Sequence, residues 1–202
     1  MEFLTFDKAM EIGGFIIGLL YLYWEYRANR LLWLAGLLMP CMSMWVYFRA
    51  GLYADFTMNI YYLVMAIYGL LAWTGRDKAR KSAEETPKSA PLRISRFPLS
   101  RLAPILAATT AIYLFIAWVL ITFTNSTVPW LDALTTALSM VATWMLARKY
   151  VEQWLVWTAV DIISSGLYFY KGIPLYGILY AIYTAIAILG YRKWLRLMHS
   201  GH

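Results

Sequence analysis

The sequence is dominated by seven apolar blocks, each close to the length that a helix needs to cross a bilayer. The blocks run approximately over 9–24, 31–48, 56–73, 102–123, 128–146, 153–170 and 175–191. A segment inside lipid must satisfy its backbone hydrogen bonds internally, which favours helices, and the alternating pattern of barrel strands is absent. We therefore expect an all-α polytopic membrane protein with seven transmembrane helices.

The composition excludes several classes of function. Only 14% of the 202 residues are charged, whereas a soluble domain carries roughly 25%. The seven blocks leave no room for a separate soluble domain, and no phosphate-binding loop pattern is present. His199 and His202 lie at the C-terminal end, and Cys41 is the single cysteine. We expect no enzyme activity, no cofactor, no metal site and no nucleic-acid partner; the lipid bilayer is the expected environment.

The distribution of Lys and Arg predicts the orientation. Seven spans place the two termini on opposite sides, and fifteen of the eighteen basic residues fall on the side of the C-terminus. Because basic loops stay in the cytoplasm, we expect the N-terminus outside and the C-terminus inside. The hydrophilic stretch 74–101, which holds eight of these residues, is then a cytoplasmic linker.

The chain also contains an internal repeat. A displacement of 121 residues aligns twelve identical pairs within 27–73 without a gap. The pairs include Trp33 with Trp154, Tyr62 with Tyr183, Ala66 with Ala187, Gly69 with Gly190 and Trp73 with Trp194. One helix separates the two three-helix units, so the repeats are parallel, in the 3+1+3 arrangement of SWEET-like transporters. We expect a first bundle over 1–73, the linker over 74–101, a linker helix over 102–123 and a second bundle with a cytoplasmic tail over 124–202.

Asp161 is the most informative single residue, because it lies near the centre of a span. A carboxylate there is costly unless it is paired or hydrated, and it marks a functional site by default. Trp154, Trp157 and Asp161 recur at helical spacing on one face, which suits a flat aromatic cation held by ring stacking and a counter-charge. The alternative is a protonated Asp161 that hydrogen bonds Ser164 or Ser165.

Further candidates lie on the third and seventh spans. Asn59 and Tyr62 share a face of one, and Tyr180 lies at the corresponding place on the other. The amide of Asn59 can read a polar group of a ligand or bond a neighbouring helix. The small residues of these columns indicate close helix packing. Trp73 and Trp194 stand at the ends of spans, where we expect interfacial belt residues.

The span 128–146 carries a stripe of four hydroxyl side chains. They are Thr135, Thr136, Ser139 and Thr143. Hydroxyls at helical spacing either line a polar path or bond the carbonyls of their own helix.

Together these motifs resemble the PnuC-type vitamin transporters. The resemblance rests on 143–149, 152–157, Asp161, 167–172, 179–180, 190–194, Asn59 with Tyr62, and Gly69 with Trp73. It implies a SWEET-like fold in a bacterial inner membrane and facilitated diffusion of nicotinamide riboside, with trapping by a cytoplasmic kinase. A monomer and a homo-oligomer are both compatible with it. Two departures from the family pattern are Leu70 after Gly69, where tryptophan is common, and Asp161, where nicotinamide riboside carriers often have asparagine.

The expected site therefore holds a small vitamin. Trp157 would stack the aromatic ring, Asp161 would balance its charge and Asn59 would read a polar group, with Tyr62, Tyr180 and Trp154 as secondary contacts. Nicotinamide riboside is the first candidate, and thiamine is the alternative because its aminopyrimidine can donate to a carboxylate. A non-transporting receptor or scaffold and a proton-coupled carrier that uses Asp161 are the other hypotheses.

The orientation is tested by thiol labelling of intact cells. A cysteine introduced at Ser89, in a background without Cys41, should resist membrane-impermeant reagents because 74–101 is expected on the cytoplasmic side. The same cysteine should react after the cells are permeabilised. Ready labelling of intact cells would reverse the assigned topology.

Overall fold

Each apolar block that the structure describes forms a helix. The computed structural model describes residues 17–49, 53–81, 92–172 and 174–200. The helices are 17–26, α2 (Leu32–Arg49), α3 (Tyr53–Lys81), α4 (Leu102–Phe123), α5 (Pro129–Ala147), α6 (Gln153–Tyr170) and α7 (Pro174–His199), with a 3₁₀ turn at Leu99–Arg101. The expected all-helical architecture is confirmed. Of the first predicted span, 9–24, only the part from residue 17 on lies within the described residues.

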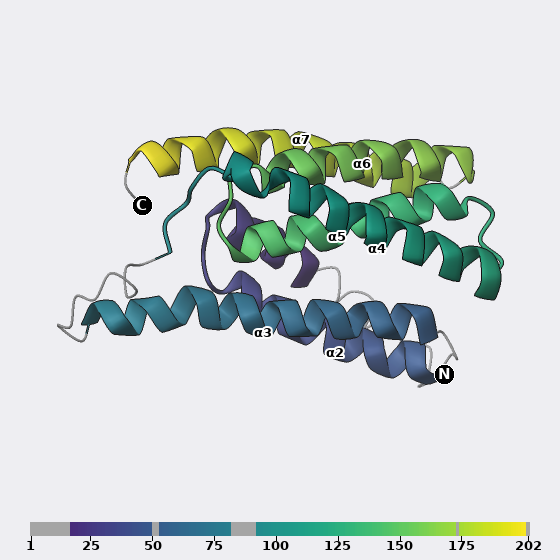
Figure 1. Cartoon of the computed structure of the whole chain (residues 1–202), viewed down its shortest axis with the longest axis horizontal. Coiled ribbons are helices and arrows are strands. Elements are labelled where there is room, and N and C mark those ends of the chain that lie inside the picture. The colour runs from purple at the N-terminus through teal and green to yellow at the C-terminus, as the bar shows by residue number, and fades with distance from the viewer. Residues whose placement is uncertain (1–16, 50–52, 82–91, 173, 201–202) are drawn as a thin grey trace. The chain divides into compact units, whose positions relative to one another are not determined.

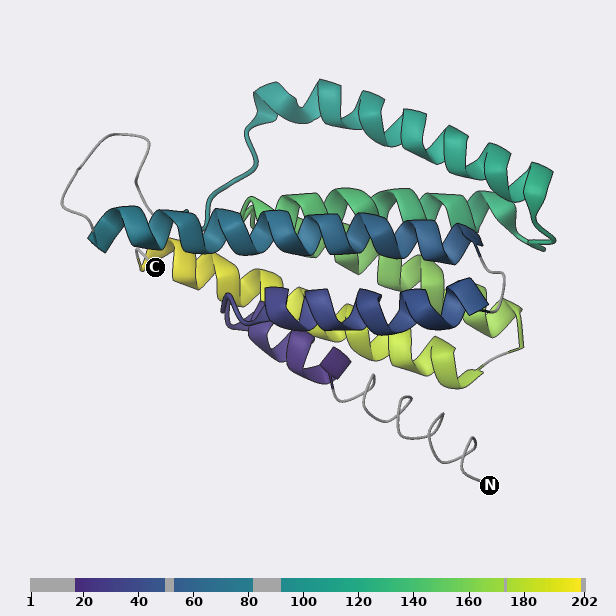
Figure 2. The same ribbon diagram turned by 90° about the horizontal axis from the view of Figure 1, so that it is seen from below.

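The chain divides into two units, 1–92 and 93–202. In the first, α2 packs along α3, and the two helices run side by side in Figure 2. The preceding helix turns into α2 through Ala28, whose φ is +51°. The side chain of Asn29 closes this turn, because its Oδ1 accepts the N–H of Leu31 at 3.0 Å. The helix α3 continues to Lys81, past the predicted end of its span at residue 73.

The α2–α3 interface is built around one buried indole. Trp33 is 1% exposed and covers Gly69 so closely that a Cβ at this glycine would collide with the ring. The Trp33 ring also meets that of Trp73 edge-on, with 5.6 Å between centroids and 86° between planes. Only a glycine lets the two helices approach this far with an indole between them.

The second unit repeats this construction at the predicted displacement. Trp154 lies over Gly190, where a Cβ would sit 2.8 Å from the indole. Its ring meets Trp194 at 5.9 Å and 82°. Lys149, the counterpart of Ala28, also adopts a positive φ of 56°. The sequence repeat is thus confirmed as a repeat of packing and of backbone conformation.

The expectation that Trp73 and Trp194 form an interfacial belt is wrong. Trp73 is 4% exposed and Trp194 is fully buried. Position at the end of a span suggested an anchor, but both rings fill the space beside the indole of their own repeat. Packing between helices has taken precedence over contact with the membrane surface.

In the second unit α6 packs against both α5 and α7, and α4 packs on α5 (Figure 1). The side chains of α4 point almost entirely outward, and Ala117 is its buried residue. Three helical segments of the described residues are long and apolar enough to cross a membrane, Phe56–Thr74, Leu99–Phe123 and Pro129–Ala147. Because α4 is apolar and little of its surface is covered by protein, it is suited to contact with lipid.

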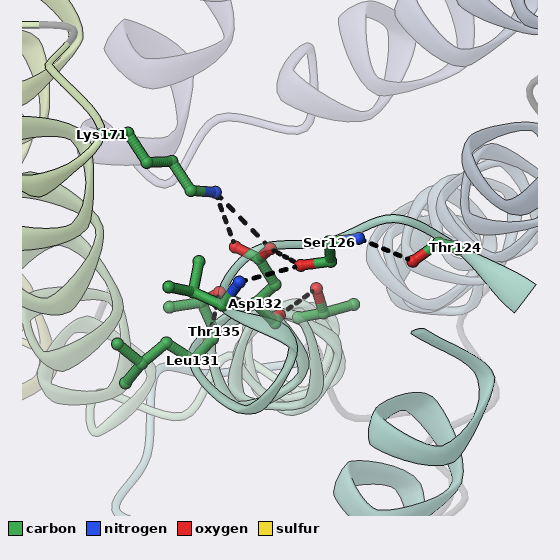
Figure 3. Close-up of polar contacts among 8 residues, drawn as sticks. Thr124, Ser126, Leu131, Asp132, Thr135 and Lys171 are labelled. Carbon is green, nitrogen blue, oxygen red and sulfur yellow. Dashed lines mark hydrogen bonds and ion pairs between the residues drawn. The ribbon is translucent and has the colours of Figure 1, made fainter. Parts of the chain in front are cut away.

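An ion pair joins the beginning of α5 to the end of α6. Lys171 Nζ lies 3.1 Å from Asp132 Oδ1, and Ser126 Oγ donates to Asp132 Oδ2 at 2.7 Å (Figure 3). Ser126 Oγ in turn accepts the N–H of Val128 at 3.3 Å. The carboxylate in the first turn of α5 also faces the positive end of the helix dipole. This network closes the α4–α5 connection and fastens α6 to it.

The two glycines under the indoles should not tolerate a methyl group. We expect Gly190→Ala to destabilise the protein by about 1–3 kcal/mol, because the indole of Trp154 must move out of a packed site. Gly166→Ala is the matched control on α6, since nothing lies within 4 Å of a Cβ at that position. The control should leave thermal stability in detergent unchanged or raise it slightly. Equal melting temperatures for the two variants would contradict the packing.

Candidate functional site

Buried polar groups without partners gather along α6. Gln153 is fully buried and Asp161 is 7% exposed, and the half-buried Trp157 lies between them at the same four-residue spacing. Among the described residues, neither amide atom of Gln153 nor Nε1 of Trp157 has a hydrogen-bond partner. Buried polar groups in folded proteins are nearly always paired. Gln153 and Trp157 therefore place unused hydrogen-bonding groups on successive turns of α6, and the Asp161 carboxyl follows on the next turn.

The alternative role for Asp161, a bond to a neighbouring serine, finds no support in the geometry. Ser165 donates instead to the carbonyl oxygen of Gly177 on α7 at 2.7 Å. No hydrogen bond from Ser164 or Ser165 reaches Asp161 within the described ranges. The hydrogen bond that Ser165 donates therefore does not involve the Asp161 carboxyl.

Tyrosine rings line the neighbouring part of the α6–α7 interface. Tyr180 stacks on Tyr168 with 5.2 Å between centroids and 13° between planes. Tyr183 meets the ring of Tyr180 edge-on at 5.7 Å. The Asp161 carboxyl lies within electrostatic range of Tyr180 and Tyr183. The structure thus brings Asp161 of α6 and Tyr180 of α7 close together. Both are candidates for the site that the sequence predicts.

Trp154 occupies a different environment from Trp157. Its ring is 2% exposed and is committed to the contacts with Gly190 and Trp194. The ring of Trp157 is half-buried. Trp157 is therefore the less buried of the two indoles, while Trp154 is committed to packing between α6 and α7.

The candidates of the first unit lie on α3. Asn59 and Tyr62 are both half-buried, and the Tyr62 ring meets that of Tyr61 edge-on at 5.5 Å. They stand three residues apart and so on one face of the helix, as expected.

The candidate residues of α6 occupy positions at which the two repeats differ. A displacement of 121 residues places Trp157 on Gly36 and Asp161 on Pro40. Pro40 lies inside α2 and has no N–H, so the carbonyl of Gly36 loses its helical hydrogen bond. The packing pairs repeat between the two units, whereas the residues with chemistry of their own do not.

The hydroxyl stripe of α5 bonds its own backbone. Thr136 donates to the carbonyl of Asp132 at 2.7 Å, and Ser139 and Thr143 donate to carbonyls four residues earlier at 2.8 Å. Thr135 does the same at 3.1 Å. Of the two readings of this stripe, the geometry favours backbone bonding, because the donor of each hydroxyl is already used.

Sequence reasoning missed two buried polar residues. Gln153 begins α6, where a polar residue ordinarily faces water, and Glu25, 2% exposed, precedes the loop to α2. The signal that could have found them is their counterparts in the repeat, Leu32 and Leu146, both fully buried. Within the described ranges, no group of three or more His, Cys, Asp or Glu residues could hold a metal ion.

Internal repeats of membrane helices are the architecture of many secondary transporters. A family model described as nicotinamide mononucleotide transporter matches residues 8–196. The chain belongs to this family, which confirms the resemblance found in the sequence, and it is a membrane transporter rather than an enzyme.

Several characterised relatives are similar over most of the chain. The nicotinamide riboside transporter PnuC of Escherichia coli is 28% identical over 170 residues, 74% of this chain and 70% of that protein. PnuC of Neisseria mucosa is 25% identical over 96% of this chain and 76% of its own length. The riboflavin/roseoflavin transporter RibM of Streptomyces davaonensis is 29% identical over 95% of this chain and 88% of its own length.

A solved structure is also similar. The crystal structure of the vitamin B3 transporter PnuC superposes with a TM-score of 0.68 at 23% identity, covering 96% of this chain and 83% of that one. This likeness establishes the fold.

Proposed function

We propose that the protein carries nicotinamide riboside across the bacterial inner membrane by facilitated diffusion. The observation that carries the proposal is the family match over residues 8–196, together with relatives named as nicotinamide riboside transporters. The unpaired polar and aromatic face of α6 supports it. Nicotinamide riboside has a flat cationic ring, a carboxamide and ribose hydroxyls, and these groups need stacking, a counter-charge and hydrogen bonds.

In this proposal each candidate residue has a distinct part. The Trp157 indole stacks the pyridinium ring, and such contacts contribute about 0.5–2 kcal/mol each. Asp161 balances the positive charge, and Asn59 bonds a polar group of the substrate. Tyr62 and Tyr180 are secondary contacts. Trp154, because of its packing, acts mainly as support.

Two other vitamins are favoured by specific observations. Thiamine is favoured by the carboxyl of Asp161, which can accept from an aminopyrimidine. Riboflavin is favoured by the similarity to RibM, which extends over 95% of the chain. All three vitamins present a flat aromatic system, so the Trp157 face accommodates each. The identity of the vitamin then depends on the polar groups around that ring.

The direction of transport rests on the charge asymmetry. Fifteen of eighteen basic residues on one side favour an outside N-terminus and a cytoplasmic C-terminus. A uniporter only equalises concentrations, so net uptake requires a reaction that removes the substrate inside. Phosphorylation by a cytoplasmic kinase, which traps the nucleoside as an anion, is the class of reaction that fits.

The proposal is tested with purified full-length protein. Binding of nicotinamide riboside, thiamine and riboflavin is measured by calorimetry, and uptake of each into proteoliposomes is followed with and without a pH gradient. We expect the tightest binding for nicotinamide riboside and uptake that does not depend on the gradient. Binding without uptake would identify a receptor instead, and gradient-driven accumulation a proton-coupled carrier.

The stacking role of Trp157 makes a separate prediction. Trp157→Ala should weaken binding by about 1–3 kcal/mol, because a stacked ring and its cation–π attraction are lost. Trp118→Ala on α4 is the matched control, since this indole is 55% exposed on the outward side of its helix. Calorimetry should show unchanged affinity for the control. Similar losses in both variants would place the binding site elsewhere.

The role of Asp161 is decided by Asp161→Asn, which keeps the shape and removes the charge. If the carboxylate is a counter-ion, its loss should lower the affinity for both cationic vitamins. As an acceptor from an aminopyrimidine, its loss should harm thiamine more, since an unpaired buried donor costs about 1–3 kcal/mol. We expect a shift in preference toward nicotinamide riboside. Unchanged affinities for both ligands would remove Asp161 from the site.

A further inference from the structure

The segment that leads into α4 forms a strap on the second unit. Residues 92–98, here called the strap, run extended to the α5–α6 loop and then into the 3₁₀ turn (Figure 1). Ser95 N donates to the carbonyl of Lys149 at 3.1 Å, and Val151 N donates to the carbonyl of Ser95 at 3.0 Å. Ile94 is buried beside them, at 6% exposure. The loop is thereby paired with a segment more than 50 residues earlier in the chain.

Glu152 is the side chain that receives the strap. Its Oε2 accepts the N–H of Phe97 at 2.7 Å, and its Oε1 lies 3.4 Å from the Arg96 guanidinium. Arg96 also reaches the hydroxyl of Tyr191 on α7 at 3.4 Å. The Arg96 side chain is 57% exposed, so its ion pair adds little. The short charge-assisted bond from Phe97 N is the main attachment.

Comparison of the two repeats shows what the strap replaces. In the first repeat the same loop closes itself, because Asn29 caps the N–H of Leu31. In the second repeat the counterpart of Asn29 is Tyr150, which cannot form that cap. Instead, Tyr150 packs its ring edge-on against Phe97 at 5.3 Å. The loop before α6 keeps the backbone bonds of its counterpart, and the strap adds contacts where the first repeat has the Asn29 cap.

Glu152 is also the residue immediately before α6. Although it stands at the N-cap position, its side chain makes no capping bond to its own helix. The carboxylate is turned to the strap instead. Trp157 follows five residues later and Asp161 nine residues later on the same rigid helix, so a change at Glu152 shifts both.

We propose that Glu152 is a positioning residue for the carrier site. By holding Phe97 and Arg96 it fastens the strap, and the strap fixes the start of α6 and thus the placement of the face that bears Trp157 and Asp161. This inference rests on the proposed function, because α6 is taken to contact the vitamin. Loss of Glu152 should weaken vitamin binding and transport without unfolding the protein.

The docking of the strap is tested first, without any substrate. Limited trypsin digestion of the full-length protein should leave the Arg96–Phe97 bond intact in the wild type and cleave it in Glu152→Ala. Cleavage of the wild type as fast as of denatured protein would overturn the proposal. This measurement is independent of which vitamin is carried, so it stands even if the proposed function fails.

The positioning role is then tested by binding of nicotinamide riboside. We expect Glu152→Ala to raise the Kd about tenfold, as for loss of a charge-assisted hydrogen bond. Glu152→Gln retains an acceptor for Phe97 N and should restore most of the affinity. Lys171→Gln is the matched control, because it removes an ion pair at the other end of α6 and leaves the strap untouched. It should bind as the wild type does.

Two results would refute the positioning role. One is a Glu152→Ala protein that is cleaved at Arg96 yet binds with wild-type affinity. The other is an equal loss of affinity in Glu152→Ala and Lys171→Gln, which would indicate general loosening of the helix. If Glu152→Ala does not fold, Glu152→Asp takes its place, because the shorter side chain keeps the charge and withdraws the carboxylate from Phe97 N; the same two results would then refute the role. Absence of vitamin binding by the wild type itself would instead contradict the proposed function.

Discussion

Each unit of the molecule is held together by an indole that lies on a glycine of the next helix. The two rings, Trp33 and Trp154, are almost completely buried, and each is met edge-on by a second tryptophan. In a membrane, helices gain little from burying apolar surface, so association depends on close van der Waals packing. A broad flat ring against bare backbone supplies more of this contact than a pair of aliphatic side chains. The placement of α6 beside α7, and with it the site, follows from this contact.

The repeats share their packing and differ in their chemistry. In the first repeat, a Cβ built on Gly36 would lie 3.5 Å from a ring carbon of Tyr21. At the equivalent positions the second repeat has Trp157 and Ala142. Large and small residues have exchanged places between adjacent helices, which conserves volume. The exchange brings an indole with an unused Nε1 onto α6. The two repeats thus share a fold, while only the second carries the proposed binding face.

Much of this architecture could be predicted, because the bilayer constrains the sequence as well as the fold. The bounds of α4 and α6 coincide with the predicted 102–123 and 153–170, since apolar content and helical backbone end together there. In α3 the helix extends beyond the apolar block, because helix-forming Arg, Ala and Lys residues carry it on to Lys81. The pairing of the strap with the α5–α6 loop and the hydrogen bond of Ser165 could not be predicted. The strap is attached mainly through backbone groups, which any residue type can supply. Ser165 donates to the carbonyl of Gly177 and not to Asp161, and sequence spacing does not distinguish these two acceptors.

Pro40 has a mechanical consequence. Pro40 removes one backbone hydrogen bond from α2, whereas the equivalent residue of α6 is Asp161, which has a backbone N–H. A rod weakened at one point flexes there, and an unbroken rod tilts as a whole. The two repeats therefore share packing contacts and differ in the stiffness of α2 and α6. A load along the helix axis would bend α2 at Pro40 before it bends α6.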